Sequence, residues 1–150
     1  LWNYYNRVPR SLGCSLETAD SWTYTTATFR QANANVLNQL DLVVGVAEDM
    51  VMAEVFMRAA NSSASIGVAV GVGVNSTSVN SAGIMTIVVA SHTTANVATP
   101  VYCGYQGIMA AGRNYLAQLE YSNATGATTW YGDNNTPTIL QTGIIGTTYA

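Results

Sequence analysis

Residues 66–74 show the most regular pattern of side chains in this sequence. Every second position is β-branched, and the positions between them carry only glycine or alanine. The two sets are Ile66, Val68, Val70, Val72 and Val74, and Gly67, Ala69, Gly71 and Gly73. Successive side chains of a strand point to opposite faces, so we expect a strand whose β-branched face lies in the core. Its small face leaves the backbone bare, and another sheet, a loop or a neighbouring subunit can approach it closely.

Alternating or short apolar segments recur along the chain and predict further strands. Residues 40–46 are apolar enough for a central strand. Segment 51–58 fits either a helix or a strand; we favour a strand, because its neighbours are strands. Its inward residues would be Val51, Ala53, Val55 and Met57. The other predicted strands cover residues 22–28, 84–89, 99–105, 112–121, 128–133 and 139–149.

Polar turns separate these segments, and no helices alternate with them. The turn or loop residues cluster at 33–35, 75–81, 92–96 and 123–126. This arrangement predicts an all-β chain that folds as an antiparallel β-sandwich of the jelly-roll type. A chain of 150 residues fits a single domain. We place that domain at residues 14–150, preceded by an extended arm of residues 1–13.

The arm is rich in aromatic residues and arginine, the side chains that anchor protein interfaces. We therefore expect contacts outside its own domain from Trp2, Tyr4, Tyr5, Arg7 and Arg10. A frayed terminus is the alternative. We expect no signal peptide, because residues 1–5 lack a basic flank and an apolar core.

Charge is scarce and unusual in kind. Charged residues make up 9% of the chain, against about 25% in an ordinary globular domain. All five basic residues are arginine, which reflects either an interface or a compositional bias of the source genome. The net charge of -3 argues against a nucleic-acid partner, and no apolar run is long enough to span a membrane. Low charge leaves more apolar surface than suits a monomer of this size, so we expect a homo-oligomer.

Neither metal nor cofactor motifs are evident. Cys14 and Cys103 have no partner at zinc-ligand spacing; they could form a disulfide, although two free buried thiols are favoured. The pair Glu48–Asp49 and the segment Asp133–Asn135 could hold calcium, but ordinary turn capping explains them better. We expect no cofactor.

Catalytic residues are also weakly indicated. The one histidine, His92, could form a triad with Ser91 or Asp133, and eight carboxylates could supply a catalytic pair, but no motif supports either. Trp22, Trp130 and Tyr131 could stack on a sugar ring, although aromatic residues more often fill cores. We therefore expect a protein that is not an enzyme.

Two pairs of blocks carry a family resemblance. One pair is Tyr5–Arg10 with Asp20–Asn33, and the other is Gly112–Glu120 with Thr128–Asp133. Together they resemble small domains of tailed-bacteriophage structural proteins. The resemblance implies a β-sandwich unit of the virion that decorates the capsid or forms part of a tail or fibre. It also implies a homotrimer, contacts with other virion proteins such as the major capsid protein, and no catalytic residues.

Two other functions remain open at this point. One is a carbohydrate- or receptor-binding module at the tip of a phage tail fibre, which would use exposed tryptophan and tyrosine side chains. The other is a hydrolytic enzyme, which would need a cleft with paired acids.

Overall fold

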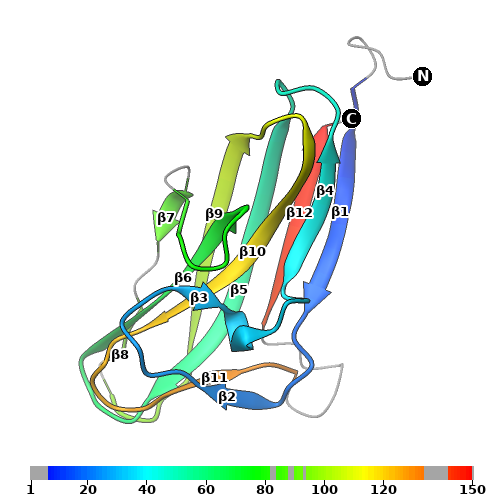
Figure 1. Cartoon of the computed structure of the whole chain (residues 1–150). Helices are drawn as coiled ribbons and strands as arrows, with labels where there is room; N and C mark the ends of the chain where they lie inside the picture. Colours follow the sequence, from blue (N-terminus) through cyan, green and yellow to red (C-terminus); the bar gives the residue numbers. More distant parts are fainter. Residues whose placement is uncertain (1–6, 82–83, 88–89, 93, 134–141, 150) are drawn as a thin grey trace.

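Two antiparallel sheets form the molecule (Figure 1). A computed structural model describes residues 7–81, 84–87, 90–92, 94–133 and 142–149. Within them, sheet A contains β1 (Pro9–Leu16), β2 (Ser21–Thr23), β5 (Met50–Asn61), β7 (Ile84–Ile87), β9 (Thr99–Ile108), β11 (Thr128–Tyr131) and β12 (Gly143–Tyr149). Sheet B contains β3 (Arg30–Gln31), β4 (Gln39–Val44), β6 (Ile66–Val74), β8 (Ala90–His92) and β10 (Gly112–Ser122). A short 3-10 helix, η1 (Ala32–Ala34), lies where a turn or loop is predicted.

Strand β5 organises sheet A. Strand β9 pairs along one side of it, and β12 and β11 pair end to end along the other. Strands β1 and β2 continue the sheet beyond β12 and β11, and β7 extends it beyond β9. In sheet B, β10 lies between β6 and the end-to-end pair β4 and β3, with β8 beyond β6.

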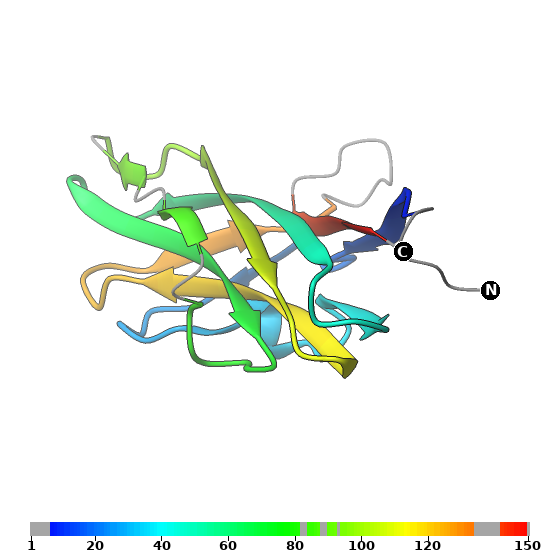
Figure 2. The ribbon, with the colours of Figure 1, turned by 90° about the horizontal axis from the view of Figure 1, so that it is seen from above.

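This connectivity is that of a jelly roll. If each end-to-end pair counts as one interrupted strand, sheet A has the order β1/β2, β12/β11, β5, β9, and sheet B has the order β4/β3, β10, β6, β8. Successive strands of this set lie in opposite sheets, except β6 and β8, which are neighbours in sheet B. Figure 2 shows β5 and β12 in one layer and β10 and β4 in the other. The predicted antiparallel β-sandwich is thus confirmed.

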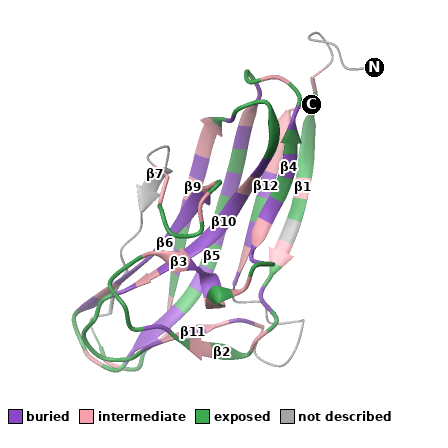
Figure 3. Cartoon of the chain, viewed as in Figure 1, coloured by how far each residue is buried: buried purple, intermediate pink, exposed green. Residues whose placement is uncertain are grey.

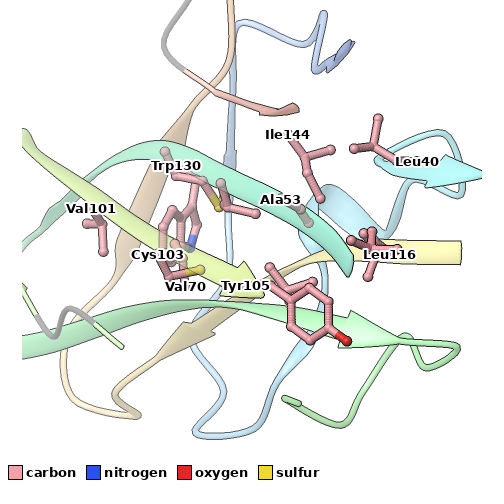
Figure 4. Packing of buried hydrophobic residues seen from close by; sticks show 14 of the residues in the cluster. Leu40, Ala53, Val70, Val101, Cys103, Tyr105, Leu116, Trp130 and Ile144 are labelled. Carbon is pink, nitrogen blue, oxygen red and sulfur yellow. The ribbon is translucent and has the colours of Figure 1, made fainter. Parts of the chain in front are cut away.

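The core fills the space between the two sheets (Figure 4). The β-branched face of β6 lies in it, as predicted: Val68, Val70 and Val72 are fully buried. The segment that fitted either a helix or a strand is strand β5. Its four predicted inward residues, 51, 53, 55 and 57, are all buried. Trp130 is the largest fully buried side chain and packs with the same cluster.

Several predicted boundaries are wrong. Strand β1 begins at Pro9, so residues 9–13 belong to sheet A rather than to an arm. A bulge between Ser11 and Gly13, with Gly13 at φ 89°, breaks the alternation that would reveal this strand. Strand β4 is an edge strand of sheet B, not a central one, because it pairs only with β10. Its outward residues Asp41 and Val43 are accordingly exposed.

Other predictions are corrected in detail. The strand predicted at 22–28 is only β2, because the chain then turns toward sheet B; the hydroxyl of Tyr24 closes that turn on the carbonyl of Thr28 at 2.9 Å. The loop predicted at 92–96 begins with the end of β8, whose register pairs His92 with Ile66. The strand predicted at 139–149 is described from Gly143, and residues 134–141 lie outside the described part.

The small-residue face of β6 is covered by the chain itself. A Cβ atom on Gly73 would overlap the backbone carbonyl of Ser76. A Cβ atom on Gly71 would lie 2.9 Å from Cγ of Asn80 and 3.2 Å from the ring of Phe29. The sequence left open whether another sheet, a loop or a neighbouring subunit packs against this face. At Gly71 and Gly73 it is the chain's own loop 75–81 and Phe29, which precedes β3.

Two buried carboxylates fasten the crossing segments. Glu120 on β10 accepts hydrogen bonds from the indole of Trp22 at 2.6 Å and from Arg30 Nε at 2.7 Å. Burial raises its pKa, partly offset by these donors and the charge of Arg30. Glu17, after β1, accepts bonds from the amide of Asn38 at 2.6 Å and the backbone N–H of Ala19 at 2.9 Å. Burial raises the pKa of Glu17, but its hydrogen bonds together lower the pKa by more, so the net shift is downward.

The lowered pKa of Glu17 predicts a specific loss of stability in acid. A carboxyl group whose folded pKa lies below its unfolded value, near 4.5, stabilises the fold above that value. This stabilisation disappears as the pH falls through the folded pKa. Glu17→Gln should therefore flatten the fall of Tm between about pH 5 and pH 3, while lowering Tm at pH 7 through weaker bonds. Thermal melts of both chains across this range measure it. Asp41→Asn, at an exposed position of β4, is the control, and an unchanged acid slope in Glu17→Gln would contradict the assignment.

Candidate interaction surface

The outer face of sheet A is apolar and open to solvent. Alternation along each strand turns one set of side chains into the core and the other outward, as Figure 3 shows for β5 and β9. The outward set contains large apolar side chains with 40–56% of their surface exposed. They are Leu16 on β1, Met52 and Phe56 on β5, Tyr102 on β9 and Ile145 on β12.

Pairing register brings these residues together. Phe56 lies opposite Tyr102 across the β5–β9 pair and opposite Gly143 across the β5–β12 pair. Met52 lies opposite Thr147, and Ile145 lies opposite Glu54. Directly opposed side chains of an antiparallel pair share one face at about 5 Å between Cβ atoms, so these apolar side chains form a patch on one face of sheet A, around Glu54.

Two shallow hollows indent this patch. The larger has a volume of about 340 Å³, and its outward walls come from Met52, Glu54, Gln106, Ile145 and Thr147. Tyr149 also lines this hollow. Gly104 forms part of its floor and leaves space above the backbone, because a Cβ atom there would meet nothing nearer than the backbone oxygen of Ala53 at 4.0 Å.

The smaller hollow has a volume of about 210 Å³ and lies on the other side of Glu54, beside Leu16, Phe56 and Gly143. Glu54 is exposed and is the one charged residue that lines either hollow. The face therefore offers apolar walls with a single carboxylate between two depressions. It suits a partner that brings apolar or aromatic side chains with a polar tip.

Arg7 fastens the start of the described chain to one end of the sandwich. Its guanidinium lies 2.8 Å from Asp49 and 3.4 Å from Glu48, in the turn between β4 and β5. This predicted interface residue is therefore engaged within its own chain. Arg10, also predicted, lies exposed at the start of β1. Trp2, Tyr4 and Tyr5 lie outside the described residues.

The four predicted interface positions on β6 do not lie on the open face. Ala69, Gly71 and Gly73 are buried, and Gly67 is half-buried. The chain's own loop 75–81 and Phe29 cover Gly71 and Gly73. The open patch on sheet A was not predicted. Its residues occupy the outward positions of strands whose buried positions were predicted, and outward positions are usually polar. Large apolar residues at such positions, for example Met52 and Phe56, were the signal in the sequence.

Residues considered for chemistry are engaged elsewhere. Trp130 is fully buried, so it cannot stack on a sugar. Trp22 is half-buried, packs against the core and donates its indole N–H to Glu120. The ring of Tyr131 lies 5.8 Å from the guanidinium of Arg58. Cys103 is a free, buried thiol, and burial raises its pKa to about 12, so it is unreactive near neutral pH.

Several acidic residues of the described chain pair with arginine side chains. Within the described ranges, no three side chains of His, Cys, Asp or Glu gather as metal ligands would. Glu48 and Asp49, once candidates for calcium, face Arg7, and Asp41 lies 3.3 Å from Arg113. The side chain of His92 is outside what the structure describes.

Comparison with known sequences gives no relative. The chain matches no protein-family model, and no curated protein matches it. In the described part of the chain, no helix is long and apolar enough to cross a membrane. What points to function is therefore the geometry of the chain's own residues.

Proposed function

We propose that this chain is a non-enzymatic structural subunit of a bacteriophage virion, a capsid decoration or a tail or fibre component, that assembles with copies of itself. The observation that carries the proposal is the open apolar face of sheet A. An exposed apolar patch of this kind on a chain with 9% charged residues is typical of a surface that other protein covers.

Two further observations support a virion role. Jelly-roll sandwiches are used by viral capsid and lectin domains, although the fold alone does not decide function. The two pairs of sequence blocks resemble domains of phage structural proteins, and trimers are common among these. Mass spectrometry of purified phage particles should find the chain at a copy number that is a multiple of three. Its absence from particles would contradict the proposal.

A charge placed in the open face should break self-association. Ile145 is 51% exposed and lies between the two hollows. In an oligomer covered on this face, Ile145→Asp would bury an unpaired charge, so we expect association to weaken at least tenfold. Light scattering during size-exclusion chromatography at micromolar concentration measures the change, and Tm should stay within a few degrees.

Val43→Asp is the matched control, because Val43 is 77% exposed on an edge strand of the other sheet. It should leave the oligomer intact. A native chain that is monomeric both in solution and on particles would overturn the self-association. Dissociation by Val43→Asp with no effect of Ile145→Asp would place the interface elsewhere.

A further inference from the structure

The first strand begins beside the larger hollow. Pro9 pairs with Tyr149, and Tyr149 lines that hollow. The start of β1, the end of β12 and the start of β5 lie together at the upper end of the molecule in Figure 1. The Arg7–Asp49 ion pair fixes the chain at this end, and Asp49 is 3% exposed. The arm thus begins from a fixed point beside the open face.

The described residues favour an outward path for the arm. Val8 precedes a proline, which holds it extended and continues the direction of β1 beyond the end of the sheet. Residues 1–8 contain no glycine or proline, and Asn3 and Asn6 are the turn-forming residues among them. Six extended residues reach about 20 Å. That is enough to lie across a neighbouring copy.

The arm also matches the hollow chemically. Trp2, Tyr4 and Tyr5 combine large apolar rings with one polar hydrogen each. The hollow offers apolar walls from Met52 and Ile145, which suit rings, and thioethers pack well against them. Glu54, Gln106 and Thr147 supply acceptors for an indole N–H or a phenol O–H at its rim.

We propose that the aromatic arm of one copy, through Trp2, Tyr4 and Tyr5, binds in the larger hollow on sheet A of the next copy. The inference rests on the self-association in the proposed function and names the contact that produces it. The contact is head-to-tail, because the arm and the hollow are different surfaces. Head-to-tail contacts close into rings when the rotation between copies allows, and a trimer is one such ring.

A photo-crosslinker in the arm tests this directly. The photoreactive phenylalanine analogue p-benzoylphenylalanine replaces Tyr4, and isotopically heavy and light copies of the full chain are mixed, allowed to exchange and irradiated. Mass spectrometry should find heavy–light cross-links that join the arm to the segment of β5 containing Met52. The same probe at Leu37, 72% exposed in the segment between η1 and β4, is the control and should not reach Met52. Cross-links only within one copy, or only to other surfaces, would overturn the inference.

A triple variant gives an independent readout. W2A/Y4A/Y5A should raise the dissociation constant of the oligomer at least tenfold, with the circular dichroism spectrum of the sandwich unchanged. Unaltered association would overturn the role of the arm. If W2A/Y4A/Y5A associates normally while Ile145→Asp dissociates the oligomer, self-association through sheet A is supported and only the proposed arm contact is wrong. If the native chain is already monomeric, both fall.

Discussion

Replacing Val70 with aspartate should cost the fold about 3–5 kcal/mol, the penalty for an uncompensated charge in a protein core. Val70 is fully buried between the sheets and pairs directly with Glu120. The new carboxylate would therefore lie opposite an existing one, and like charges at opposed positions of a strand pair repel. Natural domains have only about 5–15 kcal/mol of stability in total. We expect Tm to fall by roughly 10 °C or more.

Val70→Asn separates charge from polarity at the same site. It buries a polar group of the same size without a formal charge and should destabilise less than Val70→Asp. Val43→Asp, on an exposed position of β4, should change the free energy of unfolding by no more than about 0.5 kcal/mol. Thermal and denaturant melts followed by circular dichroism compare the three. An unchanged Tm in Val70→Asp would mean that this face of β6 is not in the core.

The second large effect is expected at Gly73. A methyl group there would overlap the backbone carbonyl of Ser76, and that turn cannot move freely. The backbone N–H of Asn75 donates to the Tyr115 carbonyl at 3.0 Å, and the Asn75 side chain accepts from the Tyr115 N–H at 2.9 Å and donates to Asn114 at 2.8 Å. Gly73→Ala should therefore destabilise by about 1–3 kcal/mol through overpacking.

Gly104→Ala is the matched control on the opposite sheet. In the W2A/Y4A/Y5A background, which lacks the aromatic arm side chains, the added methyl group would project into the hollow, where the nearest atom is 4.0 Å away, so Tm should hardly change. Gly73→Ala is compared in the same background. The two alanine variants together test that the chain's own loop covers the outer face of sheet B, whereas the outer face of sheet A is open. Equal Tm values for both variants would contradict this difference.

Alternation predicted much of the fold. It identified β6 and β10 nearly to the residue, because each of these long strands has one face that must be apolar. Segment 51–58 fitted either a helix or a strand, and its strand neighbours decided the correct assignment as β5. It failed where pairing is short or irregular. Strands β2 and β3 have only three and two residues, too few to show a period, and the bulge in β1 shifts its alternation by one position.

The interaction surface was harder to predict for a different reason. The glycine and alanine positions of β6 correctly indicated a close approach, but sequence pattern does not distinguish a neighbouring subunit from the chain's own loop. Asn80 and Ser76, which fill this space, belong to a polar segment with no apolar pattern of its own. The patch on sheet A joins residues from β1, β5, β9 and β12, and only the pairing register brings them together.

The place of β12 in sheet A has a consequence for how the chain folds during synthesis. Strand β12 lies between β1 and β5, so the first strand has no neighbour in its sheet until nearly the last described residues have been made. Pairing Pro9 with Tyr149 closes a loop of almost the whole chain, and such distant contacts make folding slow. Strand β5 meanwhile has β12 missing from one edge, and an unpaired edge promotes aggregation. The nascent chain therefore depends on rapid completion of its C-terminal strand.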